Sequence, residues 1–285
     1  MKIKDTTFKN SAILLILAWL CLLALIPNVL VFITSLLEPG DNEIVHLSFS
    51  LQSYLTLLSP IYGKIFIRSF YIASLCTLLT LILAYPFAYI VSRSTHYKNL
   101  ILLFVIIPFW TSSLIRAYAI IALLKTKGIL NSILLYLGII HTPLQLMYTN
   151  TAVLIGLVYN LLPFMILPLY ANLEKLDHRL IDAAKDLGAN RLTVLFKILF
   201  PLTLPGILAG CMLVFLPAMT MFFIPDLLGG SKTMLLGNLI QNQFLSARNW
   251  PVGSAVSISL TVMMLLLVLV YRHYSKNNKD TRAIL

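Results

Sequence analysis

Six long apolar stretches, separated by polar segments, form the main pattern along the chain. The apolar stretches lie at about 12–37, 66–92, 100–124, 151–171, 204–225 and 252–271, and the longest polar segments at 38–65, 125–150, 172–203 and 226–251. Each stretch is long enough to cross a hydrocarbon layer of about 30 Å as a helix. Because unpaired backbone N–H and C=O groups are costly in lipid, and the stretches exceed strand length, we expect helices throughout. The pattern predicts an all-α membrane protein with six transmembrane helices.

Composition and charge agree with a membrane setting. The 285 residues are 59% hydrophobic and 11% charged, with a mean hydropathy of +0.92. Fourteen of the 21 Lys and Arg residues fall at the two ends of the chain, at 93–98 and in the segment 172–203. Since cytoplasmic segments carry the excess of basic residues, we expect both termini and this segment to be cytoplasmic. Orientation and contact with anionic lipid explain the net charge of +11 without a nucleic-acid partner.

The polar segment 172–203 carries the signals of two short helices. Asp177 is placed to cap a helix over 178–187, Gly188 to end it in the left-handed conformation, and Asn190 to cap a second helix that reaches Phe200. A small apolar face on the first helix is expected to let another protein approach closely. Its members are Leu180, Ile181, Ala183, Ala184 and Leu187. An amphipathic surface helix without a partner is the alternative interpretation.

The spacing within this segment favours the partner. Asp182-Ala183-Ala184 precedes Gly188 by three intervening residues, and nine more separate Gly188 from Ile198, which is followed by Pro201. This resembles the signature loop of importer-type ABC permeases, Glu-Ala-Ala, then Gly, then Ile-x-Leu-Pro, with Asp182 in place of Glu and Phe200 in place of Leu. The resemblance implies the type I ABC importer permease fold and a loop that docks on a separate ATPase.

Further segments resemble a narrower family, the spermidine/putrescine importer permeases of the PotB type. The matching segments include Pro108-Phe109-Trp110-Thr111, Leu162-Pro163-Phe164-Met165, Leu216-Pro217-Ala218-Met219 and Trp250-Pro251. The resemblance implies a bacterial inner-membrane protein whose partners are a second homologous permease, a cytoplasmic ATPase dimer and a periplasmic polyamine-binding protein. ATP and magnesium would then be bound by the ATPase, so that no cofactor is expected on this chain.

No motif for catalysis is found. His-Glu-x-x-His and Gly-x-Ser-x-Gly are absent, and the five histidines are scattered. The run Gly229-Gly230-Ser231-Lys232-Thr233 resembles a phosphate loop only weakly, because Ser231 stands where a Gly should precede the lysine and no buried strand leads into it. We therefore expect a transport subunit rather than an enzyme.

A cationic cargo would need carboxylates, carbonyls and aromatic faces along its path. We expect such a path to use Asp226, Trp110 and Tyr159, with Tyr118, Asn160 and Phe222 as further candidates. A helix-end contact is the alternative role for Asp226, and packing or an interfacial belt for the aromatic residues. Arg116 lies near the middle of the third stretch, where a lone cation is costly. We expect it to pair with a carbonyl freed by a proline or with a carboxylate of a second permease, or to face a water-filled cavity; a gating role is a further alternative.

The expected organisation is one membrane domain with short additions. An N-terminal helix and outer loop occupy 1–65, the permease core 66–271, and a cytoplasmic tail 272–285. A short surface helix ending near Gly138 is expected in the outer segment 125–150, as a landing surface for an external partner. The expected function is ATP-driven uptake of polyamines. A permease for another small cation or nutrient is an alternative, as is a channel or ion-coupled carrier working alone, while a membrane enzyme lacks a catalytic constellation.

Overall fold

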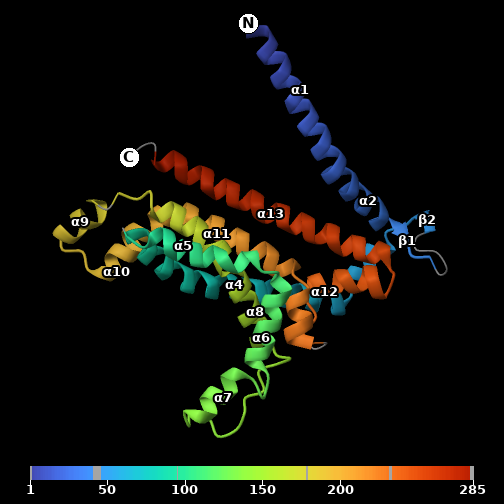
Figure 1. Ribbon diagram of the computed structural model, residues 1–285. Coiled ribbons are helices and arrows are strands. Elements are labelled where there is room, and N and C mark those ends of the chain that lie inside the picture. The colour runs from blue at the N-terminus through green and yellow to red at the C-terminus, as the bar shows by residue number, and fades with distance from the viewer. Residues whose placement is uncertain (1, 41–45, 95, 178, 231–232, 283–285) are drawn as a thin grey trace. The chain divides into compact units, whose positions relative to one another are not determined.

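The computed structural model describes residues 2–40, 46–94, 96–177, 179–230 and 233–282, with side chains for 8–40, 46, 48–94, 96–177, 179–230 and 233–269. Helices dominate the described residues (Figure 1). In the first third they are α1 (Lys2–Leu20), η1 (Cys21–Leu25), α2 (Ile26–Ser35), α3 (Gln52–Leu57) and α4 (Pro60–Arg93). The middle contains α5 (Lys98–Ile106), η2 (Ile107–Trp110), α6 (Ser113–Leu124), α7 (Ile129–Tyr136), α8 (Asn150–Leu173), α9 (Arg179–Asp186) and α10 (Arg191–Thr193). The remainder contains η3 (Val194–Leu199), α11 (Phe200–Thr220), η4 (Pro225–Gly229), α12 (Leu236–Gln241), η6 (Asn242–Ser246) and α13 (Trp250–Arg282).

Six segments in the described part of the chain are long and apolar enough to cross a membrane. This confirms the predicted fold class, an all-α membrane protein with six transmembrane helices. The six segments are Phe8–Ser35, Pro60–Arg93, Ser113–Tyr136, Asn150–Leu173, Arg191–Thr220 and Trp250–Leu269. The first, fourth and sixth match the predicted stretches closely. The second, third and fifth differ from them.

The third predicted span, 100–124, is wrong as one continuous helix. The chain forms the shorter apolar helix Lys98–Trp110, is extended at Thr111, and starts again at α6, whose N-cap Ser112 accepts a hydrogen bond from the Leu114 N–H at 3.3 Å. Pro108 has no N–H to donate to the preceding turn, and the three hydroxyl residues that follow provide a new helix start. The candidate span Ser113–Tyr136 therefore combines α6, a turn and α7.

The fifth span starts earlier and ends earlier than predicted. Its helix runs from Arg191 through the π-helical segment η3 into α11 and ends at Thr220, where the next residue is extended. Asp226 therefore does not end this span but lies beyond it in η4. The second span likewise begins at Pro60 and not at 66.

The chain divides into two compact units, of which the first comprises 1–63 and 239–267. Its polar loop holds a two-stranded antiparallel hairpin, β1 (Leu37–Glu38) with β2 (His46–Phe49), which is a small exception to the all-α prediction. The hydroxyls of Ser35 and Tyr54 bond at 2.8 Å, and Gln243 Nε2 donates to Tyr62 Oη at 3.2 Å. The most apolar window of Phe8–Ser35 has no buried residue, so this helix presents its surface outside the chain. The domain division at 65 and 271 stays a prediction.

The second unit, 64–238 with 268–285, has α8 and α11 at its centre. Figure 1 shows α4, α5, α8 and α11 side by side, with α9 and α10 beyond one end of them. Glycines bring α8 and α11 together: a Cβ at Gly206 would lie 2.7 Å from Asn172 Cβ, and one at Gly210 would lie 2.6 Å from Met165 Sδ. Small residues at these two positions therefore allow the helices to pack closely.

Candidate functional site

The segment after α8 is built by the local signals that the sequence contains. Asp177 Oδ1 accepts the Arg179 N–H at 3.0 Å, and α9 then runs to Asp186; His178, the expected first helical residue, lies outside the described residues. Asn190 Oδ1 accepts the Thr193 N–H at 2.7 Å, so the second helix begins as predicted. Both caps satisfy backbone donors that a helix start leaves free.

Gly188 ends α9 in the left-handed conformation. Its φ is +83°, its N–H donates to the Lys185 carbonyl at 2.8 Å, and the next N–H, of Ala189, donates to the Ala184 carbonyl at 3.0 Å. This pair of bonds is the Schellman arrangement, which glycine favours because it has no Cβ to clash. A Cβ at Gly188 would meet no atom within 4 Å, so the backbone conformation and not crowding requires glycine here.

The five apolar residues expected on one face of α9 point in two different directions. Ile181 is 3% exposed and packs with Val194 and Leu199, and Ala184 is part of the same cluster. Leu180, Ala183 and Leu187 are exposed, the last at 89%. These three residues, spaced by three and four positions, share one side of the helix and are called the coupling face below. Ile181 and Ala184 therefore hold α9 against the rest of the chain, whereas the coupling face stays exposed.

The second helix of the loop reaches Phe200, as predicted, and continues beyond it into the span. Thr203 Oγ1 donates to the Leu199 carbonyl at 2.7 Å and lies 3.1 Å from the hydroxyl of Tyr85 on α4. The Tyr85 ring also stacks on Phe200, with centroids 5.3 Å apart. Ile198 and Pro201, the last two signature positions, thus lie within a continuous helix, half-buried and exposed respectively. Through Ile181, α9 packs on this helix, which continues into α11.

An ion pair that sequence reasoning missed joins two helices beside this loop. Lys98 Nζ, at the start of α5, donates to Glu174 Oε1, at the end of α8, at 2.8 Å. The hydrogen bond from Lys98 lowers the pKa of the Glu174 carboxyl, and the same bond raises the pKa of the Lys98 ammonium. Both groups therefore stay charged at neutral pH. The two residues are too far apart in sequence for any local pattern to have linked them.

The candidate path residues are not brought together at one place. Tyr159 lines a cavity of about 380 Å³ that also contains Arg116, whereas Asp226 lines a separate one of about 450 Å³ with Lys125 and Tyr148. Asn238 Nδ2 donates to Asp226 Oδ1 and to the Phe222 carbonyl, which holds the carboxylate in place.

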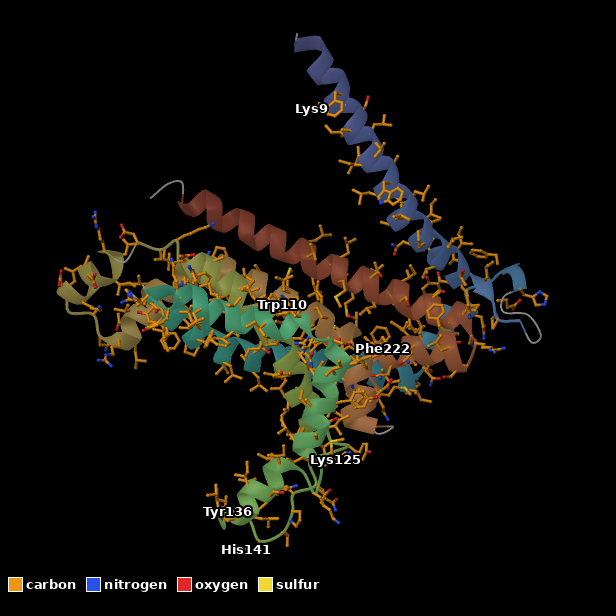
Figure 2. The ribbon with its side chains drawn as sticks, in the orientation of Figure 1. Lys9, Trp110, Lys125, Tyr136, His141 and Phe222 are labelled. Carbon is orange, nitrogen blue, oxygen red and sulfur yellow. The ribbon has the colours of Figure 1, made fainter. Side chains whose placement is uncertain are left out.

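The other path candidates differ widely in exposure. Asn160 is buried, donates to the Gly156 carbonyl at 3.1 Å, and has a side-chain oxygen without a partner among the described residues. Trp110 and Tyr118 are exposed at 79% and 59%. Figure 2 shows Trp110 and Phe222 apart from one another, and Tyr136 and His141 farther off at α7. The path residues stay a prediction.

Comparison with known proteins identifies the family. The family model described as binding-protein-dependent transport system inner membrane component matches residues 77–278, which include the coupling face and both glycines of the α8–α11 contact. The chain belongs to this family. It is an inner-membrane transport component, and its described residues include six candidate spans.

Curated relatives resemble this permease over nearly its whole length. It is 47% identical over 277 residues to the spermidine/putrescine transport system permease protein PotB of Haemophilus influenzae, covering 97% of each chain. It is 49% identical over 265 residues to PotB of Escherichia coli K12, covering 93% of this chain and 96% of the relative. Among solved structures, a bacterial ABC transporter for alginate import matches with a TM-score of 0.78 and 17% identity, covering 97% of each chain. That match shows the ABC importer permease fold.

Proposed function

We propose that this chain is a permease subunit of an ATP-driven ABC importer that takes up spermidine and putrescine across the inner membrane. The observation that carries the proposal is identity of 47–49% to curated spermidine/putrescine permeases over nearly the full length of both proteins. Both termini and the α9 loop lie in the cytoplasm in this proposal, because Lys and Arg concentrate there. Another small cation or nutrient is the alternative cargo within the same machine.

Coupling to ATP hydrolysis is proposed to use the coupling face. ATP and magnesium bind to a separate cytoplasmic ATPase dimer in this scheme, and this chain holds neither. Support comes from geometry: Leu180, Ala183 and Leu187 form an apolar stripe on a helix that is fixed at its start by Asp177 and at its end by Gly188. An apolar stripe on a short amphipathic helix suits insertion into a groove of a partner.

The remaining partners are a second homologous permease and a periplasmic polyamine-binding protein. A bacterial alginate ABC transporter of the same fold, with a TM-score of 0.78 and 16% identity, was solved with an alginate pentasaccharide-bound periplasmic protein. We propose that α7 and its flanking turns, at the end of α6 away from the α9 loop, face such a binding protein. As the sequence predicted, α7 (Ile129–Tyr136) ends near Gly138, whose φ is +69°.

The coupling proposal is tested by purifying the chain from its native membrane and quantifying the ATPase recovered with it. Leu187→Asp places a charge on the coupling face, and Tyr136→Asp is the matched control, since the two side chains are 89% and 91% exposed. We expect Leu187→Asp to lower ATPase recovery at least about tenfold, a loss of ~1.4 kcal/mol in binding, and Tyr136→Asp to leave it unchanged. Equal recovery in both variants would contradict the coupling role.

The cargo path is tested by uptake kinetics of labelled spermidine. Asp226→Asn removes the charge and keeps the shape that Asn238 holds. If the carboxylate attracts an ammonium group on the path, the apparent KM rises several-fold while the amount of protein in the membrane stays constant. Unchanged uptake kinetics would mean that Asp226 is not on the path and that its role is the helix-end contact.

A further inference from the structure

The cavity beside Arg116 contains a charge that no described residue of this chain neutralises. Arg116 is 9% exposed, and its Nε is buried without a hydrogen-bond partner among the described residues. One face of its guanidinium lies over the Phe109 ring, 5.4 Å from the centroid. The guanidinium forms neither an ion pair nor a side-chain hydrogen bond with any residue that the structure describes. A buried cation in a membrane span without a partner is costly, so a counter-charge is expected.

The cavity itself is apolar and opens to the outside of the chain. It has a volume of about 380 Å³ and lies between α4, α5, α6 and α8, with Leu83, Phe104, Pro108, Tyr159 and Pro163 among its lining residues. Three of these are well exposed: Leu83 at 55%, Phe104 at 64% and Tyr159 at 46%. A side chain from another molecule can therefore enter from the surface and reach the guanidinium.

The occupant must be an anion that reaches this depth in the membrane. None of the ten Asp and Glu residues of this chain falls in any of its six apolar stretches. Tyr159 and Ile166, which line the cavity, lie on either side of the middle of α8 (Asn150–Leu173), far from the surfaces where lipid phosphates lie. A polyamine is a cation and is repelled by the guanidinium. A carboxylate side chain on a membrane helix of another subunit meets both requirements of charge and depth.

We propose that the cavity receives an Asp or Glu side chain from the second permease, and that Arg116 forms an intersubunit ion pair with it. The proposal rests on the proposed function, because it takes the second permease as a partner. Pairing of the charges inside a low-dielectric cavity is strong only when the geometry is good, and the planar guanidinium offers two parallel N–H groups to a carboxylate. Neutralising Arg116 in this way also removes a repulsive charge from the neighbourhood of a path for a cationic cargo.

A zero-length cross-link tests the contact directly. In the assembled complex, Arg116→Lys keeps the charge and supplies a nucleophilic amine. A membrane-soluble carbodiimide activates a nearby carboxyl group, the amine displaces the activated group to form an amide bond, and the carbodiimide leaves as its urea. We expect mass spectrometry to find the amide between this position and an Asp or Glu of the second permease. Tyr118→Lys is the matched control, since position 118 is on the opposite side of α6 and its native side chain is 59% exposed.

Recovery of the second permease gives an independent measurement. We expect Arg116→Gln to lower it at least about tenfold, the effect of ~1.4 kcal/mol in binding. Arg116→Lys, which keeps the charge but not the two parallel N–H groups, should lower it less. Removal of the cross-linked carboxylate should cause the same loss as Arg116→Gln, and these two changes together should cause no further loss. The amount of each variant inserted in the membrane is measured alongside, so that misfolding is separated from lost assembly.

Each other outcome has a defined meaning. An amide to a carboxylate of this same chain, or no amide in an assembled complex, would overturn the proposal. Normal recovery of the second permease with Arg116→Gln would also overturn it. If native mass spectrometry showed that this variant has lost a bound anionic lipid, the occupant of the cavity would be a lipid. If the unaltered chain is recovered without any second permease, the proposed function fails together with the ion pair. Recovery with one but without the cross-link overturns the ion pair alone.

Discussion

The contact between α8 and α11 and the turn that ends α9 both depend on glycine, but for opposite reasons. At Gly206 and Gly210 the glycine is required by crowding, because a Cβ at either position would lie 2.6–2.7 Å from an atom of α8. At Gly188 nothing lies within 4 Å, and the positive φ of +83° is what requires glycine. The α8–α11 contact is therefore formed between residues of the same chain, whereas the turn at Gly188 holds the exposed leucines of α9 in a fixed position.

This difference indicates where the chain needs partners. In the α8–α11 contact, the large side chain of Met165 is fully buried against Gly210, so that this contact is completed by residues of the same chain. On α9 only Ile181 and Ala184 turn inward, and Leu187 stays 89% exposed although the helix is capped at both ends. A well-defined element with an uncovered apolar face is typical of a binding surface. Substitutions in the two regions should therefore fail in different ways.

The largest effect is expected from Gly206→Val. The added side chain would overlap Asn172 and the Pro168 carbonyl, and overpacking of this kind costs about 3 kcal/mol or more where neighbours cannot move. We expect a strong reduction of the protein accumulated in the membrane and of its thermal stability in detergent. Gly63→Val is the control, because a Cβ at that glycine in α4 would meet no atom within 4 Å. Similar losses in both variants would mean that valine in a helix, and not the close contact, is responsible.

Gly188→Val should separate folding from function. A β-branched residue at positive φ costs about 1–2 kcal/mol, so the end of α9 should shift while the spans remain inserted. We expect near-normal protein in the membrane with spermidine uptake reduced at least about tenfold. Gly138→Val imposes the same strain at φ +69°, also without neighbours within 4 Å, but at the end of α7, and it should leave the recovery of the ATPase unchanged while Gly188→Val lowers it. Normal uptake with Gly188→Val, or an equal loss of ATPase recovery with Gly138→Val, would contradict a specific role of the α9 turn.

Thr203→Val tests whether the α9 loop and the α8–α11 contact are held together as one rigid unit. The hydroxyl of Thr203 joins the helix of the loop to Tyr85, and removing it leaves the Tyr85 hydroxyl without this partner, at a cost of about 1 kcal/mol. Thr220→Val is the control, since Thr220 is exposed and bonds only to carbonyls of its own helix at 3.2 and 3.3 Å. Thermal unfolding of the purified subunit should show a lower midpoint for the first variant than for the second. Equal midpoints would mean that the α4 contact does not hold the helix.

Sequence reasoning succeeded where a signal is local. The caps at Asp177 and Asn190 and the left-handed stop at Gly188 each depend on one residue and its immediate neighbours, and all three were predicted. The break at Thr111–Ser112 was missed because apolar content averaged over a stretch hides two polar residues that provide a helix start.

Tertiary relations were harder to infer. The helical spacing placed five apolar residues on one face of α9, but which of them turn inward depends on Val194 and Leu199, which approach only in the folded chain. The contact of Tyr85 with Thr203 likewise joins residues 118 positions apart. The six path candidates were chosen by residue type and by position in or near the spans, and neither determines which of them line the same cavity.

The smallest effect is expected from breaking the ion pair between Lys98 and Glu174 with Glu174→Gln. Both side chains are in contact with solvent, at 37% and 41% exposure, so the pair contributes little and salt screens it. The lowered pKa of Glu174 means that its contribution is present above the usual carboxyl range near pH ~4.3 and is lost as the pH falls through the lowered value. The raised pKa of Lys98 means that the ammonium persists up to and beyond its usual value near ~10.4. Thermal unfolding should therefore show a small deficit for Glu174→Gln that is constant from about pH 5 to about pH 9 and shrinks in high salt. A deficit in thermal stability that changes sharply near neutral pH, or that high salt does not reduce, would contradict this prediction. Glu174 would then act through packing, as the residues of the α8–α11 contact do, and not through a solvent-exposed ion pair.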